Sequence, residues 1–396
     1  MADWRQTTVG DVMTLQRGFD ITKSQQNPGD VPVVSSGGIS SFHDTAMVSS
    51  PGVVMGRKGT LGKVFYLDRD YWPHDTTLWV KDFKGNDPRF VYYFLGTLNF
   101  LGMDVGSSNP TLNRNHVHPV PIVWPSFSVQ QSISGILGAL DDKIAVNEHI
   151  AVTADALARA AFSARFQAGL DMVSRGRPLP GGWRAAALGE AAPTIESGRR
   201  PKGGVAGFSE GVPSVGAESI SGLAKFDYSK TKFVPREFFV SLKKGVVRDR
   251  DILVYKDGGR PGEFNPKVTL FGSGFPYGEL CINEHVYRVR MGAETSQAFG
   301  FYWLSSIPVM DEMRKLGTGV AIPGMNSTAF KSLPVAIPPA SEIEAFGCQA
   351  DVLIDRALIA ANESKALASL RDTLLPQLMS GRLRVKDAEK IVEDHV

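Results

Sequence analysis

The chain has 396 residues, of which 43% are hydrophobic, with a formal net charge of +2 and two cysteines. This length suffices for two or three domains with buried cores, and so weak a net charge does not by itself require a polyanionic partner. Because Cys281 and Cys348 cannot form a disulfide framework and the N-terminus lacks the features of a signal peptide, we expect a cytoplasmic protein.

The first predicted globular segment, residues 1–125, contains an apolar strand that leads into the loop MGRKGTLGK. Arg57 and Lys58 lie among its glycines, and Lys63 lies on the returning strand. Glycines permit close backbone approach and cations contact DNA, so this loop is a candidate DNA contact, with a solvated hairpin as the alternative. Asn113 and Arg114, in TLNRNHV, form a second candidate.

Further features of this segment argue against other functions. The aromatic run at residues 90–94 favours a core helix over a base-stacking platform, because five bulky side chains cover every helix face. The apolar window 91–103 is shorter than the roughly 20 residues that span a bilayer, so we predict no transmembrane segment. His116 and His118 lack metal-ligand spacing and nearby cysteines, so we predict no metal site.

A long helix and linker are predicted over residues 126–180. Spacings of four and three, typical of a heptad seam, connect nine residues: Ile133, Leu137, Leu140, Ile144, Asn147, Ala151, Ala154, Ala158 and Ala161. Asp141, Asp142 and Lys143 are residue types found in nuclease metal sites. They lie between seam positions in mid-helix, which favours a solvated or partner-facing surface. Asn147 either fixes the register of a coiled coil or is a neighbour to water.

The second globular segment, residues 181–340, repeats landmarks of the first in the same order. The matched pairs, with their offsets, are Trp4/Trp183 at 179, Gly18/Gly198 at 180, Val53/Ile252 at 199, Asp75/Glu284 and Phe90/Phe299 at 209, Gly106/Gly317 at 211 and Pro119/Pro334 at 215. Because the offsets only rise, we predict an internal duplication with loop insertions in the second copy. The alternative is that Gly, Pro and aromatic residues recur in any protein.

The second copy has its own candidate DNA contacts. The stretch collinear with the first loop offers Lys256, Arg260 and Lys267, although Asp257 and Glu263 beside them would repel phosphate. The stretch ESGRRPKGG offers three cations that either clamp phosphates or form a solvated turn: Arg199, Arg200 and Lys202.

A second long helix is predicted over residues 341–385, with Pro376 ending its regular part and a flexible tail over residues 386–396. The organisation is therefore globular, helix, globular, helix. Known enzyme motifs are missing from the sequence. The spacing of Gly56, Gly59 and Gly62 fits no nucleotide-binding loop, and neither an adenine methyltransferase motif nor a nucleophile elbow occurs.

Several motifs resemble the specificity subunit of type I restriction-modification systems: QQSISGILGALDDKIAVNEHI, the closing LLPQLMSGRLRV, and the borders WRQTTVGDV and PVPIVWP. The resemblance extends to about Val385. It implies a mixed α/β (α+β) fold with two target-recognition domains, joined by two long antiparallel coiled-coil helices with pseudo-two-fold symmetry. Each domain would read one half of a split, asymmetric double-stranded DNA target, and the helices would set the gap.

The resemblance also implies a non-catalytic chain that binds no cofactor and has no membrane partner. Two adenine methyltransferase subunits would bring S-adenosylmethionine, and restriction subunits would bring ATP and Mg²⁺. A helix of about 38 residues is roughly 57 Å long, against about 34 Å for one turn of DNA, which suits a spacer between two readers. The alternatives are a duplicated protein-only scaffold, or a fragment of an enzyme that cuts or modifies DNA.

Overall fold

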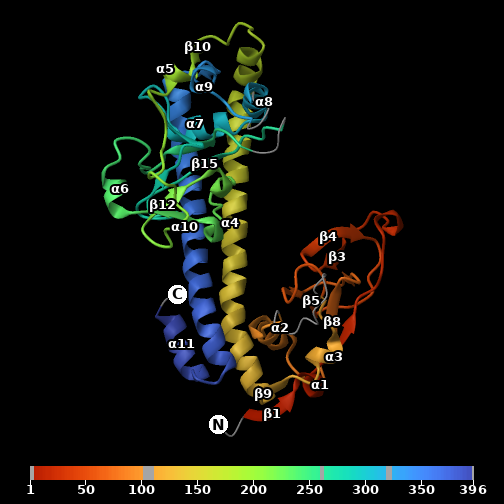
Figure 1. Ribbon diagram of the computed structural model, residues 1–396. Coiled ribbons are helices and arrows are strands. Elements are labelled where there is room, and N and C mark those ends of the chain that lie inside the picture. The colour runs from red at the N-terminus through yellow and green to blue at the C-terminus, as the bar shows by residue number, and fades with distance from the viewer. Residues whose placement is uncertain (1–3, 101–110, 259–262, 318–322, 395–396) are drawn as a thin grey trace. The chain divides into compact units, whose positions relative to one another are not determined.

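The computed structural model describes residues 4–100, 111–258, 263–317 and 323–394, and the chain divides into two compact units (Figure 1). Unit 1 comprises residues 1–143 and 367–396, and unit 2 comprises residues 144–366. Both divisions fall within long helices, α4 (Phe127–Ser174) and α10 (Ala340–Met379), so each unit holds one part of either helix.

Unit 1 contains three small sheets. An outer pair joins β1 (Trp4–Thr8) to β9 (Pro121–Pro125). The largest sheet is antiparallel and has the order β2 (Thr14–Arg17), β8 (Thr77–Asp82), β5 (Gly52–Gly56), β6 (Val64–Leu67). In the third sheet, β3 (Val31–Ser35) lies between antiparallel β4 (Gly38–His43) and parallel β7 (Trp72–Pro73). The helices are α1 (Val9–Val12), η1 (Lys23–Gln25), α2 (Pro88–Thr97), α3 (Arg114–Val117) and α11 (Val385–Glu393).

Unit 2 has the same three sheets. β10 (Arg184–Ala187) pairs with β18 (Pro334–Ile337). The four-stranded sheet has the order β11 (Thr194–Ser197), β17 (Val286–Arg290), β14 (Ile252–Tyr255), β15 (Val268–Leu270). β12 (Val212–Val215) lies between antiparallel β13 (Lys232–Val234) and parallel β16 (Cys281–Ile282). The helices are α5 (Leu188–Ala191), η3 (Ala217–Ser219), η4 (Tyr228–Lys230), α6 (Arg236–Val240), α7 (Gln297–Leu304), α8 (Ile307–Leu316) and α9 (Ser327–Lys331).

The identical strand orders confirm the internal duplication. Each unit even repeats the one parallel pairing, β3 with β7 and β12 with β16. The loop insertion is also visible, because residues 216–231 connect β12 to β13 where residues 36–37 suffice between β3 and β4. One predicted pair is wrong: Thr8 pairs with Pro121 and Ala187 with Pro334, so Pro121, not Pro119, is the counterpart of Pro334. Gly106, of another predicted pair, lies outside the described residues.

The aromatic runs are buried core helices, as predicted. α2 begins where the Asp87 side chain accepts a hydrogen bond from the Phe90 N–H. In the same way, α7 begins where the Ser296 side chain accepts a hydrogen bond from the Phe299 N–H. α2 packs on β5 and α7 on β14. β5 is buried throughout and β14 is buried except at Tyr255, so burial of apolar surface between helix and sheet stabilises each unit.

The long helices run antiparallel, because residues later in α4 contact residues earlier in α10. In unit 2 the Asn147 side chain contacts Glu363 at 2.9 Å and the Phe162 ring lies 5.6 Å from that of Phe346. In unit 1 the Asp141 carboxylate contacts Arg371 at 2.6 Å. Six of the nine seam positions are buried: Ile133, Leu137, Leu140, Asn147, Ala154 and Ala158. Beyond Ala158 the buried stripe continues through Phe162, Phe166 and Leu170 instead of Ala161.

Two expectations for the C-terminal region are wrong. Pro376 lies inside α10, which continues to Met379. The helix ends at Met379, two residues before Gly381, whose φ of +68° places it in the left-handed region that follows helix ends and favours glycine. The segment expected to be a flexible tail forms α11, in which Arg384 pairs with Asp387 at 2.8 Å and Ala388 is buried. Among the described residues, none of the helices has the length and apolarity to cross a membrane.

Candidate nucleic-acid interface

In unit 1, three separate backbone segments meet at one edge: residues 17–20 after β2, residues 57–58 after β5, and residues 74–76 between β7 and β8. We call these residues the unit 1 rim. The backbone N–H groups of Arg57 and Lys58 both donate to the Thr76 carbonyl, at 2.9 and 3.1 Å. Gly18 lies so close to the 74–76 turn that a Cβ there would be 2.2 Å from the His74 carbonyl oxygen. Only glycine fits that approach.

An ionic network crosses the unit 1 rim. Arg17 Nη2 donates to Asp75 Oδ2 at 2.7 Å, and Arg57 Nη1 donates to the Asp75 carbonyl at 3.3 Å. Burial opposes ionisation of Asp75, but the hydrogen bond from Arg17 and the neighbouring His74 and Lys58 charges hold its pKa below the ordinary value. Burial, reinforced by Arg17, lowers the pKa of Arg57. The Arg57 side chain is therefore partly buried and hydrogen-bonded within the protein, whereas the Lys58 side chain is exposed.

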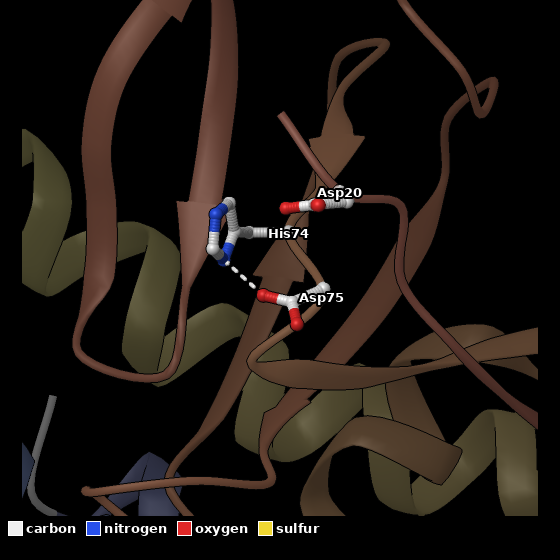
Figure 2. A group of neighbouring side chains, drawn as sticks. All are labelled: Asp20, His74 and Asp75. Carbon is white, nitrogen blue, oxygen red and sulfur yellow. Dashed lines mark ion pairs between the residues drawn. The ribbon is translucent and has the colours of Figure 1, made fainter. Parts of the chain in front are cut away.

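Asp20, His74 and Asp75 point toward one another at this rim (Figure 2), with candidate metal-ligand atoms all within 4.8 Å of each other. His74 Nδ1 lies 3.1 Å from Asp75 Oδ1 and 3.0 Å from Thr76 Oγ1. These three residues are the group best able to hold a cation in the described part of the chain. Because Arg17 already brings a positive charge onto Asp75, we interpret the group as a charge network and assign it no metal.

The unit 2 rim consists of residues 198–200, 256–257 and 283–285, which occupy the same positions as the unit 1 rim. The Lys256 N–H donates to the His285 carbonyl at 3.0 Å, matching the bond from Arg57 to Thr76. Isolated bridges also match, Lys58 with Thr111 in unit 1 and Asp257 with Gly324 in unit 2. At Gly198 a Cβ would lie 1.7 Å from the Ile282 carbonyl oxygen, so the close approach is repeated too.

Apart from Arg199, the charged side chains of the unit 2 rim are paired with one another. Arg200 forms an ion pair with Glu284 at 3.2 Å, and His285 contacts both Asp257 and Glu284. Lys256 Nζ donates to the Glu284 carbonyl at 3.2 Å and lies 5.5 Å from the centre of the Tyr287 ring. The Lys256 ammonium is therefore turned toward the protein.

Beside the unit 2 rim lies an open cavity of about 430 Å³, lined by Ser197, Gly198, Arg199, Ser241, Lys243 and Lys244. The Arg199 guanidinium lies 5.2 Å from the centre of the Phe238 ring and donates to Ser241 Oγ at 3.2 Å, which orients it along the wall. Three cations around one cavity suit an anionic ligand such as a DNA phosphate. We call this cavity the basic pocket.

Sequence reasoning missed Lys243 and Lys244. The available signal was the run KKG, where Gly245 has a φ of +78°. A Cβ at Gly245 would lie 2.9 Å from Gly198 Cα, so this glycine brings the two lysines against the segment that carries Arg199.

Other predicted contacts lie on segments beside the rims, because the Lys63 carbonyl accepts from the Gly56 N–H at 2.9 Å and the Lys267 carbonyl accepts from the Tyr255 N–H at 2.8 Å. Lys63 Nζ lies 5.3 Å from the centre of the Phe65 ring. Asn113 caps α3 by accepting from the Asn115 N–H at 3.0 Å, as Asn326 caps α9 in unit 2, so its amide has a structural role. Arg114, Lys202 and Lys267 are exposed. Arg260 lies outside the described residues.

Asp141 does not lie on a solvated or partner-facing surface as expected, whereas Asp142 is exposed as the helix periodicity predicted. Asp141 accepts from the Tyr93 hydroxyl of α2 at 2.5 Å and from Arg371 of α10 at 2.6 Å. Asp142 accepts from two guanidinium nitrogens of Arg89, at 2.6 and 3.0 Å. The helix periodicity placed Asp141 off the seam, but α2 and α10 also pack beside that face. The Asp141 carboxylate therefore links α2 to the two long helices of unit 1.

Comparisons with known proteins agree with the resemblance found in the sequence. Residues 1–153 match a family described as the type I restriction modification DNA specificity domain. No curated protein matches the chain. The S subunit of the type I restriction-modification system from M. genitalium has 15% sequence identity and a TM-score of 0.61, covering 95% of this chain and 96% of that one.

Two further solved structures were compared. An HsdS subunit from Thermoanaerobacter tengcongensis is 16% identical, covering 96% of this chain and 97% of that one, at a TM-score of 0.32. A chain from a study of complex assembly and conformational transition of the type I R-M system is 16% identical, with coverage of 96% and 98% and a TM-score of 0.40. Nothing is inferred from these two, whereas the M. genitalium S subunit shows that the fold extends over the whole chain.

Proposed function

The chain carries the DNA specificity domain of type I restriction-modification systems, and on this premise we propose that it is the non-catalytic subunit that reads the DNA target of such a system. The observation that carries the proposal is the presence of two recognition units with one strand order in a single chain. Equivalent edges of two such units would meet DNA in the same manner, one at each half of the target.

A split and asymmetric target follows from how the two units differ. Their strands match, but the rims that could enter a groove carry different side chains, such as Lys58 in unit 1 and Asp257 in unit 2. Base identity is read through side chains, so unlike rims require unlike half-sites. The stretch between the halves would be left unread, and α4 and α10 would set its length.

Phosphate contacts would fall to exposed cations beside the rims. In unit 1 these are Lys58, Lys63 and Arg114, and in unit 2 they are Arg199, Lys202, Lys267 and the lysines of the basic pocket. Such contacts add affinity for any sequence and make binding sensitive to salt.

Two adenine methyltransferase subunits, and restriction subunits through them, would supply catalysis together with S-adenosylmethionine, ATP and Mg²⁺. Exposed apolar side chains on the unit 2 parts of the long helices support docking of protein partners. Val146 and Leu157 of α4 are 54% and 56% exposed and lie eleven residues, three helical turns, apart on one face. Val352 and Ile359 of α10 are 68% and 58% exposed and lie two turns apart.

DNA binding by the assembled complex tests the proposal. We expect Lys243→Ala combined with Lys244→Ala to weaken binding to cognate and non-cognate duplexes alike and to lower the slope of log affinity against log salt by about 2, roughly 1 per phosphate contact. A titration from low to physiological salt measures both effects.

The matched control is Arg314→Ala combined with Lys315→Ala. These neighbouring cations of α8 are paired with Asp311 and Glu312 on the same helix, and we expect an unchanged slope. An unchanged slope in the Lys243 and Lys244 variant would remove the basic pocket from the interface. A wild-type complex without salt-sensitive DNA affinity would favour the protein-only scaffold instead.

A further inference from the structure

The duplication allows the two rims to be compared position by position. Three positions keep their character: Gly18 and Gly198, the acids Asp75 and Glu284, and the cations Arg57 and Lys256. These residues build the rim itself. The glycines permit the close approach, and each acid forms an ion pair with an arginine of its own rim.

Five positions differ in chemistry. They are Asp20 and Arg200, Lys58 and Asp257, Phe19 and Arg199, His74 and Asn283, and Thr76 and His285. The first two pairs reverse the sign of charge. Arg200 lies against Glu284 just as Asp20 lies close to Asp75, which supports their equivalence. One fold therefore presents a carboxylate in unit 1 where it presents a guanidinium in unit 2.

Asp20 is exposed, and no hydrogen bond or ion pair to it occurs in the described part of unit 1. Arg17 of the same rim is bound to Asp75 at 2.7 Å, and His74, with a ring nitrogen within 4.8 Å of the Asp20 carboxylate, also contacts Asp75 at 3.1 Å. An unneutralised carboxylate on a surface that meets DNA is repelled by phosphate. It is compatible with binding when it faces a hydrogen-bond donor, and in the major groove the bases offer donors only as the amino groups of cytosine and adenine.

We propose that Asp20 is a specificity-determining residue of unit 1, which accepts a hydrogen bond from the exocyclic amino group of a cytosine or adenine in its half-site. This inference rests on the proposed function. At the equivalent position of unit 2, the Arg200 side chain has donor chemistry, which suits the O6 and N7 acceptors of guanine. The two units thus read opposite hydrogen-bonding patterns from one position of a shared fold.

The first test maps methylated adenines in cells that contain this chain and its methyltransferase, with wild type, Asp20→Ala and a control compared. The control is Asp68→Ala, because the Asp68 side chain of unit 1 is 85% exposed and lies outside the rim. Alanine removes the acceptor, so we expect Asp20→Ala to make one base pair of one half-site degenerate, while the other half-site and the gap stay as in wild type. An unchanged motif overturns the inference.

The second test measures binding of the assembled complex to four duplexes that differ only at that base pair. The expected result for Asp20→Ala is a fall in discrimination of about 5- to 150-fold, with affinity for non-cognate DNA unchanged or higher because a negative charge has been removed. The preferred duplex of the wild type tells cytosine from adenine. Equal weakening on all four duplexes would overturn the inference, because it indicates a phosphate or folding role. If wild type itself yields no motif, the proposed function fails, whereas a normal motif that Asp20→Ala leaves intact removes only this inference.

Discussion

Gly18 and Gly198 hold equivalent places, and their contacts explain why the sequence repeat is visible there. In both units the chain leaves the first strand of the four-stranded sheet and passes against the turn that follows the β7 or β16 strand, with no room for a Cβ. A close backbone approach fixes glycine whatever the surrounding side chains are. The sequence showed that these two glycines match, but it could not show which backbone carbonyl groups leave no room for a side chain there.

His118 of unit 1 links pH to local stability. Its Nε2 accepts a hydrogen bond from the Leu15 N–H at 3.0 Å, which requires a neutral ring. Burial, with added repulsion from Arg114 and Lys84, lowers the pKa of His118 below the ordinary 6.5. The unfolded chain therefore binds more protons below pH 6.5. The stability contribution is fully present above that pH and is lost as pH falls through the folded-state pKa.

We accordingly expect the Leu15 amide to exchange its hydrogen faster at pH 5 than at pH 7.5, after correction for intrinsic exchange rates. In His118→Gln the side-chain oxygen can still accept the bond but cannot titrate, so protection should become independent of pH over this range. Equal protection of Leu15 at both pH values in the wild type would contradict the assignment.

At the scale of elements, the Asp141 carboxylate joins α2, α4 and α10 within unit 1. Its side chain is 22% exposed and that of its partner Arg371 is 26% exposed. Burial opposes the charged form of Arg371, yet hydrogen bonds to Asp141 and Asp372 raise its pKa. Burial, with the hydrogen bond to Asp141, raises the pKa of Tyr93 as well.

We expect Asp141→Ala to lower the free energy of unfolding by about 1–3 kcal/mol, because Tyr93 and Arg371 lose their shared acceptor. Urea titrations of Asp141→Ala, Arg371→Ala and the double variant should give a coupling energy of about 0.5–3 kcal/mol.

The control for this cycle is Asp142→Ala. The Asp142 side chain is 67% exposed, so its pair with Arg89 should contribute less than about 1 kcal/mol. Additive effects of Asp141→Ala and Arg371→Ala would show that the network does not couple the helices.

Elements with a strong periodic pattern were predictable, and those fixed by tertiary contact were not. The heptad spacing located α4, and the run of five bulky residues at 90–94, four of them aromatic, located the core helix α2. Pro376 was misjudged because α10 continues past it for three residues, to Met379, before the left-handed Gly381. The basic pocket escaped prediction because Lys243 and Lys244 join it through the approach of Gly245 to Gly198, which local sequence does not encode.

At the scale of the whole molecule, the duplication is what gives the chain its function. Insertions such as residues 216–231 lengthen unit 2 without altering its strand order, so the loops differ between the units while the sheets stay the same. The rising offsets along the sequence already indicated this duplication with loop insertions. The strand register of the two units was needed to tell which rim residues are alike in both units and which differ.

One chain that carries two unlike readers of one fold should direct methylation to a split target, and long-read mapping of methylated adenines measures this. DNA from cells that express this chain with its adenine methyltransferase should be compared with DNA from cells that lack the chain. We predict a new motif with two different half-sites separated by a gap of fixed length. The absence of a new motif with the methyltransferase present and folded, or a motif that is continuous or palindromic, would contradict it.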